Sequence, residues 1–130
     1  MRTHAKVFGI LSLFLAHDVS AETVSKRVPA NRATTLDQFM QWNNSCKNLG
    51  TITTSVTKRP SSGSLRPSVV SAPIPRKADI GSSACAGKKI KALRVVYQPK
   101  PGFRGRDSAT IWVNYGSSGR KSYSYSITVY

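Results

Sequence analysis

The chain has 130 residues and a formal net charge of +15, because 20 lysines and arginines stand against only 5 aspartates and glutamates. This length suits one ordinary domain and is too short for two. So one-sided a charge draws a protein to acidic surfaces by long-range attraction, but it says nothing about the fold.

Residues 1–21 are typical of a secretory signal peptide. Arg2 and Lys6 supply a positive start, residues 7–16 an apolar run, and Val19-Ser20-Ala21 a small-residue cleavage site. The apolar run has about ten residues, whereas a helix needs about 20 to span a bilayer. The alternatives are an uncleaved anchor or a buried helix. We expect cleavage after Ala21, a periplasmic or secreted location and no transmembrane segment in the remainder. Removing Arg2, Lys6 and Asp18 lowers the net charge from +15 to +14.

The two cysteines, Cys46 and Cys85, have no third cysteine to compete with them. Pairing is the usual outcome in an oxidising compartment. A reactive thiol pair usually has a Cys-x-x-Cys spacing, which is absent here. We therefore expect a structural disulfide between Cys46 and Cys85.

The segment that follows the predicted cleavage site is polar and basic. Residues 22–34 have hardly any apolar periodicity, which predicts a flexible basic lead-in before a domain of residues 35–130. Thr35-Leu36-Asp37-Gln38 then resembles a capping box, and Leu36, Phe39 and Met40 follow at helical spacing. These features predict a short helical turn from Thr35 to about Asn43.

The middle of the chain has strand and turn signals in alternation. Residues 49–57 are rich in Thr, Ile and Val and predict a strand, and Pro60-Ser61-Ser62-Gly63 predicts a turn. A second strand over residues 65–71 is predicted to lie at a sheet edge, because Pro67 cannot donate a ladder hydrogen bond. Residues 72–84 are expected to form a long irregular connection.

The second half alternates between apolar and polar side chains in three segments, residues 89–97, 108–115 and 122–130. The side chains expected on the buried face are Leu93, Val95, Tyr97, Ala109, Ile111, Val113, Tyr115, Tyr123, Tyr125, Ile127 and Val129. Trp112 and Ser122, Ser124, Ser126 and Thr128 fall on the opposite, wet face. One buried and one wet face is the antiparallel pattern, so we predict an all-β fold, a small antiparallel sandwich or partial barrel.

A run in this half resembles a signature of bacterial immunoglobulin-like and cadherin-like sandwich repeats. It is Tyr97-Gln98-Pro99-Lys100-Pro101-Gly102-Phe103-Arg104-Gly105-Arg106-Asp107-Ser108, and the turn Pro60-x-x-Gly63 is similar to an earlier turn of those repeats. The resemblance implies an immunoglobulin-like β-sandwich that serves in adhesion or recognition. It also implies that Tyr97 and Phe103 are core residues, that Gly105 allows a tight turn and that Asp107 binds backbone amides. The acidic clusters of the calcium-binding members and tandem repetition are both absent.

The residues that usually carry catalysis are scarce. Both histidines, His4 and His17, lie in the predicted signal peptide, which removes the commonest general acid–base and zinc ligand from the remainder. The remaining carboxylates, Glu22, Asp37, Asp79 and Asp107, form no cluster in the sequence. We therefore expect no enzyme activity, no cofactor and no metal; a Ser/Lys pair stays conceivable, but nothing marks one out.

Basic residues gather around the start of one predicted strand and the turn after it. The candidate ligand-binding residues are Lys88, Lys89, Lys91, Arg94, Arg104, Arg106 and the aromatic Trp112, with Lys100, Arg120, Lys121 and Tyr130 near them. Charge plus stacking suits an anionic polymer or envelope component, such as an acidic glycan or lipopolysaccharide. The alternatives are ordinary solvated charges with a covered Trp112, a protein-binding module such as an inhibitor or adhesion factor, or a structural envelope component. There is no specific nucleic-acid motif, and the oligomeric state stays open.

Overall fold

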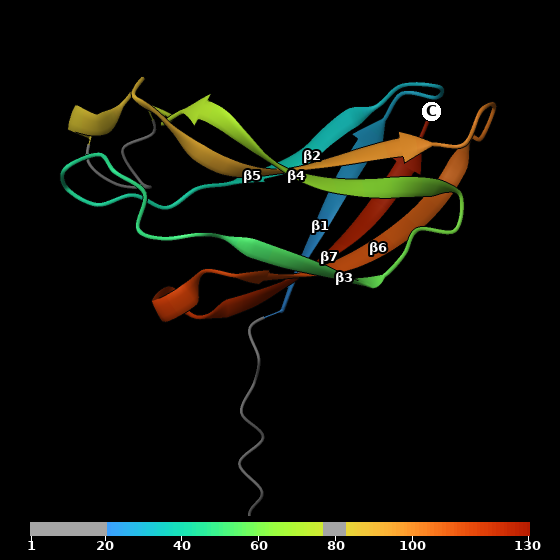
Figure 1. Cartoon of the computed structure of the whole chain (residues 1–130). Coiled ribbons are helices and arrows are strands. Elements are labelled where there is room, and N and C mark those ends of the chain that lie inside the picture. The colour runs from blue at the N-terminus through green and yellow to red at the C-terminus, as the bar shows by residue number, and fades with distance from the viewer. Residues whose placement is uncertain (1–20, 77–82) are drawn as a thin grey trace, which may run out of the picture.

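The computed structural model describes residues 21–76 and 83–130 (Figure 1). The predicted signal peptide, apart from Ala21, lies outside the described residues, and so does Asp79. The larger sheet has the order β1 (Ala21–Val28), β7 (Arg120–Val129), β6 (Gly105–Asn114) and β3 (Thr53–Lys58). The smaller sheet has the order β2 (Thr34–Phe39), β5 (Lys89–Pro99) and β4 (Gly63–Pro73). Two 3-10 turns, Ser83–Cys85 and Gly116–Ser118, join strands. The predicted all-β sandwich is confirmed.

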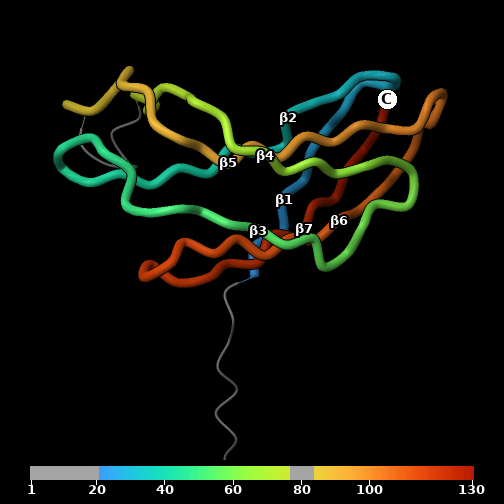
Figure 2. The backbone as a smooth tube through the Cα atoms, in the orientation of Figure 1, coloured from blue at the N-terminus to red at the C-terminus, as the bar shows by residue number. Residues whose placement is uncertain are grey.

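The strands form two facing sheets, with the second, fifth and fourth strands facing the seventh, sixth and third. Every pair is antiparallel except β1 with β7, which run parallel side by side (Figure 2). The sandwich is therefore antiparallel as predicted, apart from this one parallel pair. No hairpin joins the two strands, because the chain crosses from β1 to the other sheet, so their directions are free to agree.

The core lies between the sheets and follows the predicted alternation. Leu93, Val95 and Tyr97 of β5 face Ile111 and other inward residues of the larger sheet, and all are buried. The serines and threonines that alternate with the buried residues of β7 lie on the outer face. This separation of apolar and hydroxyl side chains fixes the register, because a slip of one residue would exchange the two faces.

The flexible lead-in predicted over residues 22–34 is wrong. Residues 21–28 form β1, which pairs with β7 along its whole length. Val28 is fully buried, and Val24 packs against the core. The strand alternation of this segment is hard to recognise in the sequence, because a lysine occupies the inward position between the two valines. The ammonium of this Lys26 pairs with Asp37 at 3.6 Å.

The short helical turn predicted from Thr35 to Asn43 is also wrong, because residues 34–39 form β2. A β-bulge lies between Thr35 and Asp37, so Leu36 is an extra residue in the strand. The bulge turns both Leu36 and Phe39 into the core, and their spacing of three therefore imitates a helix. Gln38 does not cap a helix but accepts hydrogen bonds from Arg94 on β5.

The predicted disulfide between Cys46 and Cys85 is confirmed. It ties the β2–β3 connection to the segment that leads into β5. Next to it, the Asn48 side chain donates to the Lys91 carbonyl at 2.9 Å and accepts from the Lys91 amide at 3.2 Å. The Asn48 side chain thus satisfies the backbone of β5 at a position beyond the end of β2. Together with the disulfide, these hydrogen bonds stabilise this end of the sandwich.

Candidate functional site

The outer face of the larger sheet presents an array of hydroxyl groups. We call it the hydroxyl face. It comprises Thr23, Ser25, Thr53, Ser55, Ser108, Thr110, Ser122, Ser124, Ser126 and Thr128, with Trp112 and Asn114 among them. These residues alternate with the core residues of the same four strands, so their side chains point away from the core. The described strands of the other layer all lie on the opposite side of this sheet (Figure 1).

The pairing of the strands arranges the hydroxyls in rows across the sheet. Thr23, Ser124 and Thr110 form one row, and the Oγ atoms of the last two lie 3.3 Å apart. Ser25, Ser126 and Ser108 form the next row. Neighbouring strands lie about 4.8 Å apart, and residues of one face recur about every 6.8 Å along a strand. A flat ligand therefore meets a regular grid of groups that can both donate and accept hydrogen bonds.

One end of the hydroxyl face carries two arginines. Arg27 on β1 and Arg106 on β6 both pair in register with Thr128 on β7, so they flank it from either side. The Arg27 guanidinium also lies over the Tyr130 ring, 4.9 Å from its centroid. Both arginines are exposed, and no carboxylate among the described residues pairs with either. This end can therefore receive an anion.

The other end of the face holds an aromatic ring beside a third arginine. Trp112 is half-buried between the strand partners Ser55 and Ser122, which are both small. Its ring and Arg120 help to line an open depression of about 450 Å³, together with Thr53, Thr54, Ser55 and Asn114. An indole flanked by short hydroxyl side chains is a platform on which a flat group can stack.

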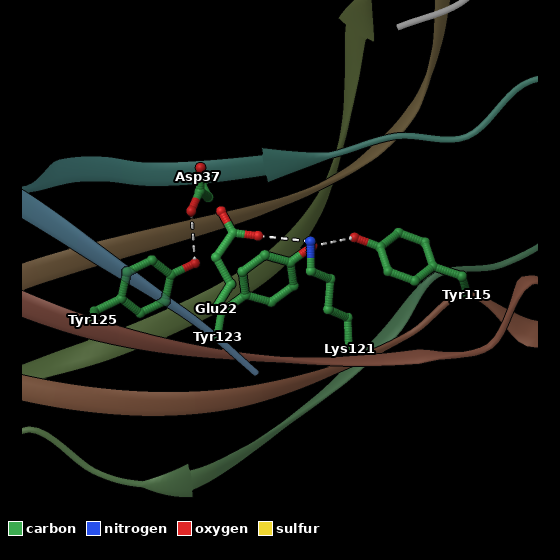
Figure 3. Close-up of polar contacts among 6 residues, drawn as sticks. All are labelled: Glu22, Asp37, Tyr115, Lys121, Tyr123 and Tyr125. Carbon is green, nitrogen blue, oxygen red and sulfur yellow. Dashed lines mark hydrogen bonds and ion pairs between the residues drawn. The ribbon is translucent and has the colours of Figure 1, made fainter. Parts of the chain in front are cut away.

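The described carboxylates are all engaged within the fold, away from the hydroxyl face. Glu22 receives a hydrogen bond from Lys121 at 2.6 Å, and Asp37 receives one from the Tyr125 hydroxyl at 2.9 Å (Figure 3). Asp107 is buried. Among the lysines and arginines that the structure describes, only Lys26 and Lys121 form ion pairs with a carboxylate. The remaining cations therefore project an uncompensated positive field.

The polar network in Figure 3 closes the side of the sandwich between β1 and β2. Burial raises the pKa of Tyr125, and the nearby Asp37 carboxylate raises it further. Burial and the hydrogen bond with the Tyr123 hydroxyl raise the pKa of Tyr115 in the same way. The hydrogen bond to Glu22 raises the pKa of Lys121. These tyrosines stay neutral and the lysine charged at physiological pH, which suits a structural network rather than proton transfer.

The structure distributes the seven candidate ligand-binding residues over several surfaces. Arg106 and Trp112 share the hydroxyl face. Arg94 lies on the outer face of the smaller sheet, held by Gln38 at 3.2 Å. Lys88, Lys89 and Lys91 are exposed near Cys85, at the opposite end of the strands from Arg104 in the β5–β6 turn. The seven residues therefore form no single patch.

Of the residues named near the candidates, Lys121 points inward to Glu22, and Lys100 donates to the Ser61 carbonyl at 3.0 Å. Arg120 and Tyr130 lie at opposite ends of the hydroxyl face. Arg27 was not among the predicted site residues, because it falls in the segment that was expected to be a flexible lead-in. The sequence signal for a strand here was weak: Val24, Lys26 and Val28 recur at every second position, which would place Arg27 on the opposite, outer face.

A second depression, of about 380 Å³, lies beside Lys91 and includes Ile52, Val69 and Leu93. Among the residues described, no three of His, Cys, Asp and Glu lie together as a metal site would require.

None of the described helices is long and apolar enough to cross a membrane.

No protein-family model matches the chain, and no curated protein matches it either.

Proposed function

We propose that the chain is an exported, non-enzymatic binding module that recognises an anionic polymer through the hydroxyl face. The supporting observation is the charge arrangement of that face. Arg27 and Arg106 stand at one end and Arg120 at the other, and each described carboxylate is engaged elsewhere in the fold. A polymer with acidic groups meets attraction along the face, which has no acidic side chain among its described residues.

We also propose that the protein acts in the periplasm or the extracellular medium and that it is related to bacterial immunoglobulin-like repeats. A disulfide is compatible with an oxidising compartment such as the periplasm or the extracellular medium. The arrangement of two facing sheets is compatible with the resemblance to bacterial immunoglobulin-like repeats, whose members serve in adhesion or recognition. A ligand of the bacterial envelope, such as an acidic glycan or lipopolysaccharide, would be encountered in that setting.

The main alternative is a protein-binding module, and its most direct route would be the addition of a partner's strand to a sheet edge. Each of the four edge strands carries a feature that opposes such addition. β1 directs Lys26 inward, β2 and β3 are bulged at Leu36 and Thr57, and β4 contains Pro67. These features favour recognition by a sheet face over recognition by an edge.

Heparin binding at low and physiological salt tests the proposal. We expect the affinity of the parent protein to fall steeply as salt rises, because cations that contact a polyanion release its counterions. Replacing Arg27, Arg106 and Arg120 with Gln should weaken binding about tenfold more than replacing Lys88, Lys89 and Arg94 with Gln. Both variants lose the same charge, so the comparison separates a site from general attraction.

Equal losses in the two triple variants would mean diffuse attraction to a polycation without a site. If heparin does not bind at low salt, the anionic-polymer proposal is wrong, and the protein-binding alternative becomes the better explanation. Circular dichroism of each variant shows whether a loss of binding is a loss of folding.

A further inference from the structure

The cations and the aromatic ring of the hydroxyl face are arranged along the strands, not across them. Arg106 and Trp112 are six residues apart on β6, which corresponds to about 20 Å. The two rows between them contain only hydroxyl side chains on the three strands β1, β7 and β6. The face is therefore polar in its middle and carries its recognition groups at two separated ends.

We infer that the polymer is an acidic polysaccharide that lies along β6. One sugar ring stacks on Trp112 with an acidic group near Arg120, and a later acidic group meets Arg27 and Arg106. The hydroxyls of the intervening sugars hydrogen-bond to the serine and threonine rows. This inference rests on the proposed function and adds the class of the polymer, its direction and its minimum length.

The chemistry of the face selects a polysaccharide over other polyanions. Serine and threonine hydroxyls donate and accept hydrogen bonds, as sugar hydroxyls do, so the two arrays can satisfy one another. Proteins that bind single-stranded nucleic acid use several aromatic side chains, one for each successive base. The described part of the hydroxyl face offers only Trp112 at one end and Tyr130 at the other. A lipid chain needs apolar surface, and here the Trp112 ring is surrounded by polar side chains.

The direction follows from the positions of the charges. On the β1 edge, the rows between the two ends finish in Thr23 and Ser25, which are uncharged. On the β3 edge, the Lys58 ammonium donates to the neutral Ser108 hydroxyl at 2.9 Å, so it keeps its charge beside the middle of β6. A ligand that crossed the strands would meet the arginines at one end only, whereas a ligand along β6 reaches both ends.

Oligogalacturonates of graded length test the inference, because galacturonate carries a carboxylate on every sugar. We expect oligomers shorter than about 20 Å to bind weakly and affinity to rise sharply once an oligomer spans the face. The fully methyl-esterified oligomers have the same backbone without charge and should bind at least tenfold more weakly. Polyphosphate of equal length, which has charge but no sugar ring, should also bind more weakly.

Trp112→Ala should weaken the long oligomers about tenfold, as removal of a tryptophan that anchors a binding surface commonly does. It should leave polyphosphate binding unchanged, because polyphosphate has no ring to stack. Trp112→Thr suits an exposed strand position and serves if the alanine variant does not fold. Trp112→Phe should recover part of the affinity, since it restores a flat ring.

The outcomes separate this inference from the proposed function. If polyphosphate and long oligogalacturonate bind equally, with no dependence on length beyond charge and none on Trp112, the polysaccharide inference is wrong while anionic-polymer binding stands. If the methyl esters bind as well as the acids, charge is irrelevant and the proposed function fails. If neither polyanion binds the full protein at low salt, both fail.

Discussion

The Tyr97 hydroxyl donates a hydrogen bond of 2.8 Å to the Asp107 carboxylate inside the sandwich. The same carboxylate accepts hydrogen bonds from the backbone amides of Ser61, Ser62 and Ser108. One buried side chain therefore joins β5, the start of β6 and the β3–β4 turn. The Gly63 backbone approaches so closely that an added Cβ would lie 2.6 Å from the Tyr97 ring, which explains the glycine at the end of that turn.

Asp107→Ala should lower the free energy of unfolding by roughly 1–3 kcal/mol, because it leaves buried donors without an acceptor. Urea denaturation measures the change. Glu22→Gln removes an exposed carboxylate and should change stability by no more than about 0.5 kcal/mol. A stable Asp107→Ala protein that no longer bound its ligand would show that Asp107 belongs to a site instead.

The Asp107 carboxylate also predicts a dependence of stability on acid. Burial alone would raise its pKa, but the hydrogen bonds from Tyr97 and from three backbone amides outweigh burial and lower it. A carboxyl group with a lowered pKa stabilises the fold above its unfolded pKa of about 3.9, and this contribution disappears as pH falls through the folded pKa. The stability difference between the parent and Asp107→Asn should therefore shrink in acid. Urea midpoints at neutral pH and below pH 4 or so measure it, and a constant difference would contradict the ionised state of Asp107.

Replacing Cys46 and Cys85 with Ser should destabilise the fold by about 4 kcal/mol on the chain-entropy model, since the disulfide closes a loop across a sequence separation of 39 residues. The bond lies beyond the end of β2, away from the hydroxyl face, so the folded fraction should keep its affinity for heparin. Thermal denaturation and binding below the melting temperature test both points. Parallel losses of stability and of intrinsic affinity would show that the disulfide shapes the site.

Val28→Ala should destabilise the protein by roughly 2 kcal/mol, because a fully buried side chain of β1 loses apolar contact and leaves a cavity. Ser25→Ala on the same strand is exposed and should be nearly neutral. Chemical denaturation of both variants provides the comparison. If both were neutral, residues 21–28 would behave as a flexible segment and the pairing of β1 with β7 would not hold in solution.

The strands of the second half could be predicted because apolar and polar residues alternate in them, most clearly Tyr123, Tyr125, Ile127 and Val129 between serines and threonines. The same alternation predicted the wet face on which Trp112 lies. β1 and β2 could not be predicted, because each breaks the rule for a tertiary reason. Lys26 points inward only because Asp37 on the opposite sheet receives it, and Leu36 changes face only because of a bulge.

Which charged residues lie together on the surface could not be predicted from the sequence either. Lys88, Lys89, Lys91 and Arg94 are close in the chain, but the three lysines lie at the Cys85 end of the sandwich, whereas Arg94 lies on the outer face of the smaller sheet. Arg27 and Arg106 are far apart in the chain, and the register of both with Thr128 brings them together. Such a pairing depends on which strands are neighbours, which local residue patterns do not specify.

The two tryptophans allow a direct measurement of where the ligand binds. Trp112 lies on the hydroxyl face, whereas Trp42 packs beside the disulfide against Ile74 and Ile90. Each indole N–H gives its own signal in a two-dimensional NMR spectrum of the nitrogen-15-labelled protein, and Trp112→Phe assigns them. During titration with an oligogalacturonate longer than about 20 Å, we predict that the Trp112 signal shifts progressively while the Trp42 signal stays in place. Binding that moved Trp42 and left Trp112 unchanged would contradict the assignment of the hydroxyl face as the binding site.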